Sequence, residues 1–111
     1  MTSEELNTKL YEKMFAEQET YRDWLLSQPA AEVLSHTYEY TMREDILMSL
    51  ECNDLTDKQC RALLKSPCPL GDVYKEWDKR ETGHMDDIRD TLESRANAVI
   101  RQEFAKSQDE R

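Results

Sequence analysis

The chain has 111 residues and carries 24 acidic against 15 basic side chains, for a formal net charge of −9. That length suits one domain, and two glycines with three prolines exclude phosphate-cradling loops, dinucleotide-binding turns and many-stranded sandwiches. The sequence has no apolar run that could span a membrane and no secretory signal, and its three cysteines favour reduced thiols, so we expect a cytoplasmic protein.

The first helix is predicted to begin near Ser3, because Thr2 and Glu5 form a Thr-x-x-Glu capping box. At about 100° per residue, one broad face collects apolar side chains: Leu6, Leu10, Met14, Tyr21, Trp24 and Leu25. The opposite side carries a stripe of carboxylates at Glu5, Glu12, Glu19 and Asp23. Ser27-Gln28-Pro29 is expected to end this helix.

A second helix is predicted from about Pro29 to Cys52. Its apolar residues are spread around most of the circumference, which is typical of a central helix touched on several sides. A short third helix is predicted from about Asp57 to Lys65, with Thr56 and Gln59 as its capping box.

The last predicted helical segment runs from about Pro69 to Ala105 and carries a heptad-like apolar seam. A kink or break near Gly83 is the alternative to one continuous helix. The sequence thus predicts an all-α fold, a compact bundle of about four helices. We expect residues 1–105 to form a single domain and residues 106–111 to be a frayed tail.

The negative charge is concentrated in the first half of the chain. Residues 1–57 hold 13 acidic and 4 basic side chains, whereas residues 58–111 hold 11 of each. This asymmetry disfavours direct contact of that half with nucleic acid or anionic lipid, and it favours a basic protein surface as partner. The alternative, given about equal weight, is that the charge only keeps a small helical protein in solution.

The candidate partner-binding residues follow from this charge and from helical position: Glu5, Glu12, Glu19, Asp23, Glu39, Glu44 and Asp45. For the stripe of the first helix, a plain solvated face is the favoured alternative. Glu44 lies on an otherwise apolar side near Tyr40, so it is either paired internally by Arg22 or Arg43 or directed at a partner. The internal pair is the favoured interpretation.

Neither catalysis nor metal binding is expected. Cys52, Cys60 and Cys68 are eight residues apart, too widely spaced for a zinc knuckle, and are interpreted as partly buried thiols. Glu81-x-x-His84 matches a di-iron ligand spacing but occurs once, where such sites need two copies. Because no nucleophile–base motif is present either, we expect no catalytic residue, no metal and no cofactor.

Several stretches resemble a small acidic protein family that is found in Firmicutes and their mobile elements and described as a domain of unknown function. They are LNTKLYEKMFAEQETYRDWLLSQPAAEVL (6–34), HTYEYTMREDILMSLE (36–51), ALLKSPCPLGDVYKEW (62–77) and MDDIRDTLESRAN (85–97). Members of this family resemble inhibitors of type II CRISPR nucleases, and the resemblance implies a protein of that kind. It supplies no functional residues.

The leading hypothesis is therefore a non-enzymatic anti-CRISPR-type inhibitor that binds a basic surface of a type II RNA-guided nuclease through its acidic N-terminal half. A compact acidic protein could occupy the basic channel that such nucleases build for nucleic acid. The alternative is a helical adaptor or structural protein that dimerises or docks through its C-terminal helix. A third hypothesis is an antitoxin-like regulator with a basic cognate partner.

Overall fold

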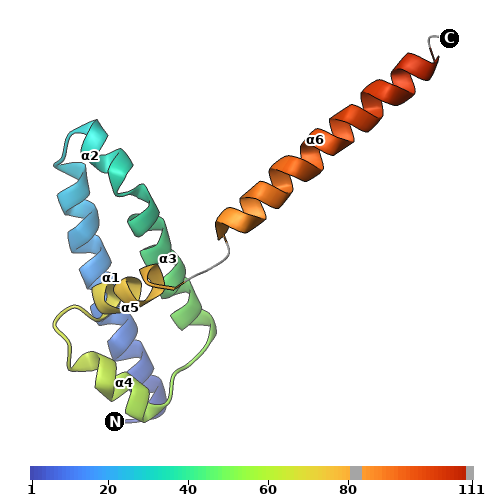
Figure 1. The fold of residues 1–111 in the computed structure, drawn as a ribbon. Coiled ribbons are helices and arrows are strands. Elements are labelled where there is room, and N and C mark those ends of the chain that lie inside the picture. Colours follow the sequence, from blue (N-terminus) through green and yellow to red (C-terminus); the bar gives the residue numbers. More distant parts are fainter. Residues whose placement is uncertain (81–83, 110–111) are drawn as a thin grey trace. The chain divides into compact units, whose positions relative to one another are not determined.

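The computed structural model describes residues 1–80 and 84–109, in which six helices and no strand occur (Figure 1). The helices are α1 (Ser3–Leu26), α2 (Ala30–Ser35), α3 (Thr37–Cys52), α4 (Asp57–Leu64), α5 (Pro69–Asp78) and α6 (His84–Asp109). The all-α fold class is confirmed. None of the helices in the described ranges has the length and apolar character that a membrane crossing requires.

The chain divides into two units, Met1–Lys79 and Arg80–Arg111. The prediction of one compact bundle of about four helices therefore needs correction, because α1 to α5 belong to the first unit and α6 belongs to the second. The segment predicted from Pro69 to Ala105 is two helices, α5 and α6, and Gly83, near which a kink or break is the alternative, lies outside the described residues. α6 continues to Asp109, beyond the predicted helix end. The single domain at residues 1–105 stays a prediction.

The second predicted helix is divided into α2 and α3 at His36. The backbone of His36 adopts φ −111° and ψ 4°, outside the helical region. On either side, the hydroxyl of Ser35 donates to the carbonyl of Glu32 at 2.8 Å and that of Thr37 donates to the carbonyl of Leu34 at 2.9 Å. Such local side-chain bonds compete with the regular helical ladder, which explains the break.

Two of the predicted helix starts are confirmed. The hydroxyl oxygen of Thr2 accepts the N–H of Glu5 at 3.1 Å, which caps α1. At α4, Thr56 accepts the N–H of Gln59 at 3.2 Å while the Gln59 amide oxygen accepts the N–H of Thr56 at 2.9 Å. This reciprocal pair is the complete capping box, so a signal of four residues was enough to locate the helix.

The core of the first unit is formed around α1. Its buried apolar side chains come from four helices: Leu6, Leu10 and Met14 of α1, Leu47 of α3, Cys60 of α4 and Leu70 of α5. α3 packs against α1, α2 and α5, as a helix with apolar residues on several sides should. However, α1 packs against all of α2, α3, α4 and α5, so α1 holds this unit together (Figure 1).

Candidate functional site

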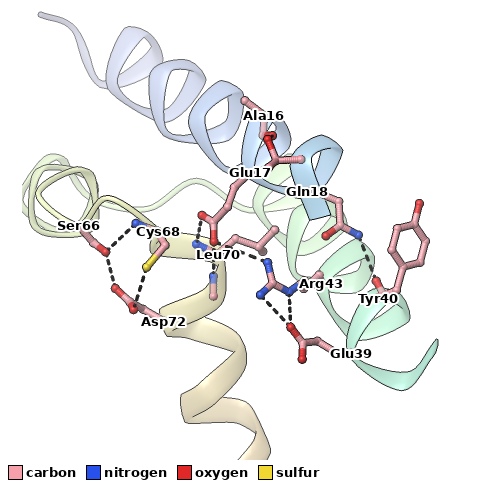
Figure 2. A network of polar contacts seen from close by, with 12 residues as sticks. Ala16, Glu17, Gln18, Glu39, Tyr40, Arg43, Ser66, Cys68, Leu70 and Asp72 are labelled. Atoms are coloured by element: carbon pink, nitrogen blue, oxygen red, sulfur yellow. Dashed lines mark hydrogen bonds and ion pairs between the residues drawn. The ribbon is translucent and has the colours of Figure 1, made fainter. Parts of the chain in front are cut away.

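The inner face of α1 carries a carboxylate that caps another helix. Glu17 accepts the backbone N–H of Leu70 at 2.9 Å and that of Gly71 at 2.7 Å, in the first turn of α5 (Figure 2). These groups lack partners within their own helix, and the positive end of the helix dipole favours a negative charge there. A Cβ atom at Gly71 would lie only 3.2 Å from Oε2 of Glu17, so glycine allows this close approach.

Arg43 of α3 completes this arrangement. Its Nη2 atom lies 2.8 Å from Oε2 of Glu39, one turn earlier on the same helix, and its Nη1 lies 3.6 Å from Oε2 of Glu17. The guanidinium carbon stands 4.4 Å from the centroid of the Tyr21 ring, a favourable cation–π geometry. The side chain of Arg43 is 12% exposed and is shared by two carboxylates, so it serves the packing of α1, α3 and α5.

Lys13 of α1 binds the C-terminal end of α4, as Glu17 binds the N-terminal end of α5. Its Nζ atom donates to the carbonyl oxygen of Leu64 at 2.9 Å and to that of Ser66 at 2.6 Å. Carbonyls at a helix C-terminus lack intrahelical donors and attract positive charge. Lys13 and Glu17 are one turn apart, so α1 holds the end of α4 and the start of α5 with side chains of opposite charge.

Two uncharged side chains of α1 make similar long-range bonds. The amide of Asn7 donates to the carbonyl of Leu55 at 3.0 Å and accepts its N–H at 2.9 Å. The amide of Gln18 donates to the carbonyl of Tyr40 at 3.2 Å and to Oε1 of Glu44 at 3.0 Å. Both side chains are buried, so these bonds fix the loop before α4 and the middle of α3 to α1.

Sequence reasoning missed this inner set of polar residues, although one signal was present. Glu17 follows Met14 by three residues and precedes Tyr21 by four, so it lies on the apolar face of α1. A charged residue on such a face needs a partner inside the protein. The prediction that Arg22 or Arg43 pairs with Glu44 is wrong, because Gln18 binds Glu44 while Arg43 is held by other carboxylates.

Burial changes the titration of several hydroxyl and thiol groups between the helices. Burial, with the negative charge of Glu39, raises the pKa of Tyr21 despite the opposing charge of Arg43. Burial and the carboxylate of Glu44 raise the pKa of Tyr40. Both phenols therefore keep their protons to a higher pH than an ordinary tyrosine does.

The cysteines do not form a common site. Cys60 is fully buried in the core, where burial raises the pKa of its thiol. Cys52 and Cys68 are exposed, so the interpretation of all three as partly buried is wrong for these two. Within residues 1–80 and 84–109, no group of three or more His, Cys, Asp or Glu side chains could hold a metal ion. Glu81 of the Glu-x-x-His motif lies outside the described residues.

The outer face of α1 carries the predicted carboxylate stripe. Glu5, Glu12, Glu19 and Asp23 are all exposed. Glu5 accepts the hydroxyl of Thr2 at 3.2 Å, whereas the other three make no hydrogen bond or ion pair with any residue that the structure describes. The structure therefore brings four of the seven candidate residues together along one side of one helix.

The three remaining candidates lie on α3 in different surroundings. Glu39 is half-buried and held by Arg43, so it belongs to the inner network. Glu44 is exposed but bound to Gln18. Asp45 is exposed and lines a hollow of about 280 Å³ with Met42, Ile46, Ser49 and Trp77. A partner could meet the stripe of α1 without meeting these three residues.

A family comparison covers most of the chain. The family model of DUF3848, described as a protein of unknown function, matches residues 6–100. The chain belongs to the DUF3848 family. No curated protein and no solved structure matches it. The predicted resemblance to a family of unknown function is thus confirmed, while the predicted links to Firmicutes, mobile elements and CRISPR inhibitors stay predictions.

In this DUF3848 protein, the charges that face inward cancel one another. Lys13 and Arg43 are two of the four bases in residues 1–57, and they are held against helix carbonyls and carboxylates. Glu17 and Glu39 are the two acids of the same network. The excess of nine negative charges in this half therefore belongs to the remaining, outer side chains.

An apolar hollow lies beside the C-terminal half of the stripe. It measures about 260 Å³ and is formed where α1, α2 and α3 meet. Its lining residues are Arg22, Leu25, Leu26, Val33, Thr37, Tyr40 and Thr41. Because three helices contribute to it, the spacing of residues along the sequence gave no sign of this hollow.

Proposed function

We propose that this DUF3848 protein is a non-enzymatic inhibitor that binds a basic surface of its partner through the carboxylate stripe of α1. The observation that carries the proposal is that Glu12, Glu19 and Asp23 are exposed and make no ion pair within the described part of the chain. Exposed charges of one sign speed the encounter with an oppositely charged surface. They would also repel nucleic acid and anionic lipid.

The proposed partner is a type II RNA-guided nuclease in the cytoplasm. Such a nuclease holds its guide–target heteroduplex in a positively charged channel and recognises mainly the backbone. An acidic helix bound along that channel would compete with nucleic acid, and inhibition would need no chemical step. The resemblance to CRISPR inhibitors noted from the sequence makes this partner the first to test.

The test is a DNA-cleavage assay in which the protein is titrated against a guide-loaded type II nuclease at low and moderate salt. The triple variant Glu12→Lys, Glu19→Lys, Asp23→Lys should weaken inhibition at least about tenfold, since three desolvated charge pairs would become repulsive. Its matched control is Asp86→Lys, Asp87→Lys, Asp90→Lys in α6, which changes the net charge equally. Equal loss in both variants, or in neither, would contradict the assignment to α1.

A second candidate function rests on α6. This helix of 26 residues carries Met85, Ile88 and Leu92 at helical spacing, and its unit contains no other described helix that could cover them. An adaptor that dimerises through this side of α6 would bury these three apolar side chains. Sedimentation of the protein alone should then give a dimer that Leu92→Glu converts to a monomer. A monomeric wild type would remove this candidate.

A further inference from the structure

The hollow at the junction of α1, α2 and α3 has the dimensions of a side-chain pocket. Its volume of about 260 Å³ is below the range of about 300–1,000 Å³ that is usual for sites of drug-sized ligands. Leu25, Leu26 and Val33 give it apolar walls, and Thr37 and Thr41 contribute from α3. Such a space suits one or two large apolar side chains.

Apolar surface continues beyond the hollow into solvent. Leu26, which forms part of the wall, is 70% exposed, and Leu34 of α2 is 72% exposed. A single exposed leucine needs no explanation, but Leu26 in the wall of an open apolar hollow, with Leu34 exposed on the same helix as the wall residue Val33, gives a partner side chain apolar surface to bury. Buried apolar anchors in pockets supply much of the affinity at protein interfaces.

The charges beside the hollow indicate the chemistry of its occupant. Asp23 precedes Leu26 by three residues and Glu19 precedes it by seven, so both carboxylates lie on the same side of α1 as this wall residue. Arg22, also in the wall, is the only base among the residues that line the hollow. A segment that places an apolar side chain in the hollow would therefore bring its neighbours against the carboxylate stripe.

We propose that this hollow is the anchor site for a basic segment of the partner protein, a segment that inserts a large apolar side chain between α1, α2 and α3 while its lysines or arginines meet Glu19 and Asp23. This inference rests on the proposed function, because it assigns the affinity-determining contact of the same interface. The stripe then provides the rate of encounter, and the hollow provides the lifetime of the complex.

The experiment uses two labelled peptides and fluorescence anisotropy. One is a lysine-rich amphipathic peptide with leucine on its apolar face, and the other has every leucine replaced by serine. The wild-type protein should bind the leucine peptide at least about tenfold more tightly than the serine peptide. Thr41→Trp fills the hollow from an exposed position of α3 and should abolish this preference. Ser49→Trp, at an exposed position of α3 that lines other hollows, should leave it intact.

The stripe variant separates this inference from the proposed function. If Glu12→Lys, Glu19→Lys, Asp23→Lys weakens both peptides while wild type binds both equally, the hollow has no occupant of this kind and the stripe proposal stands. If the leucine preference is lost in Thr41→Trp but the stripe variant binds like wild type, the hollow binds an apolar side chain without help from Glu19 and Asp23, and both the stripe proposal and the basic character of the occupant are overturned. A leucine preference that survives Thr41→Trp overturns the inference.

Three further kinds of measurement test whether this result has another cause. Circular dichroism and thermal unfolding of each tryptophan variant should match wild type, since both substituted positions are exposed. Amide chemical shifts of Leu26 and Thr41 should change on addition of the leucine peptide and not of the serine peptide. Sedimentation of the free protein tests whether a second copy of the chain occupies the hollow. A dimer that Thr41→Trp dissociates would show that it does, and would overturn the proposal.

Discussion

The two faces of α1 both carry charged residues, but those on the inner face bind neighbouring helices and those on the outer face are exposed to solvent. On the inner face, Lys13 and Glu17 reach the ends of neighbouring helices and are fixed there by backbone groups. On the outer face, the side chains of Glu12 and Glu19 are exposed and make no hydrogen bond or ion pair with the described residues. The comparison shows that the surroundings of a charged residue, more than its type, separate a structural role from availability to a partner.

The difference follows from the electrostatics of helix ends. The first turn of α5 and the last turn of α4 present backbone groups that their own helices cannot satisfy. An ion placed there gains charge-assisted hydrogen bonds in partly dry surroundings, which water does not screen. An ion on the outer face interacts with water and with salt, so its contribution to folding is small. Stability and binding should therefore be separable by mutation within this one helix.

The apolar part of the inner face should give the largest effect on stability. Leu10 is fully buried among the core residues, so Leu10→Ala should lower the free energy of unfolding by about 3 kcal/mol. The matched control is Leu26→Ala, because Leu26 lies on the same helix but is largely exposed, and the loss should be below about 1 kcal/mol. Urea denaturation followed by circular dichroism measures both. Equal losses would mean that α1 is not the centre of this core.

The carboxylate network around Glu17 should give the next largest effect on stability. Glu17→Ala leaves the N–H groups of Leu70 and Gly71 without their acceptor and removes one of the two carboxylates beside Arg43, which should cost about 2 kcal/mol. Glu19→Ala, two residues along the same helix, should change stability by less than about 0.5 kcal/mol. Similar midpoints of denaturation for the two variants would contradict the claim that charged residues on the inner face stabilise the fold and those on the outer face do not.

Lys13 should have a smaller effect, because a long side chain pays conformational entropy to hold its position. Lys13→Met keeps the apolar stem and removes the donor to the carbonyls of Leu64 and Ser66, so we expect a loss of about 1 kcal/mol. Lys9→Met is the control, since Lys9 is exposed and makes no such bonds within the described residues. Faster amide exchange at the α4–α5 connection in Lys13→Met alone would locate the effect.

The sequence predicted those features that local patterns determine. The starts of α1 and α4 follow from capping residues within four positions, and the carboxylate stripe follows from the period of the helix. The break at His36 escaped prediction because it depends on the carbonyls to which the flanking hydroxyls of Ser35 and Thr37 donate. The backbone partners of Glu17 escaped it because Leu70 and Gly71 lie more than fifty residues along the chain, where only the packed fold brings them to Glu17.

The stripe itself should give the smallest effect on stability. Glu12, Glu19 and Asp23 are like charges on one exposed face, so Glu12→Lys, Glu19→Lys, Asp23→Lys should leave the free energy of unfolding within about 0.5 kcal/mol of wild type, with any gain arising from relieved repulsion. Denaturation at low and high salt checks this, because a repulsive term would shrink as salt screens it. If the variant loses binding and keeps this stability, the stripe serves binding and is not needed for folding. A variant that unfolds would instead make the outer face part of the same structural network as Lys13 and Glu17.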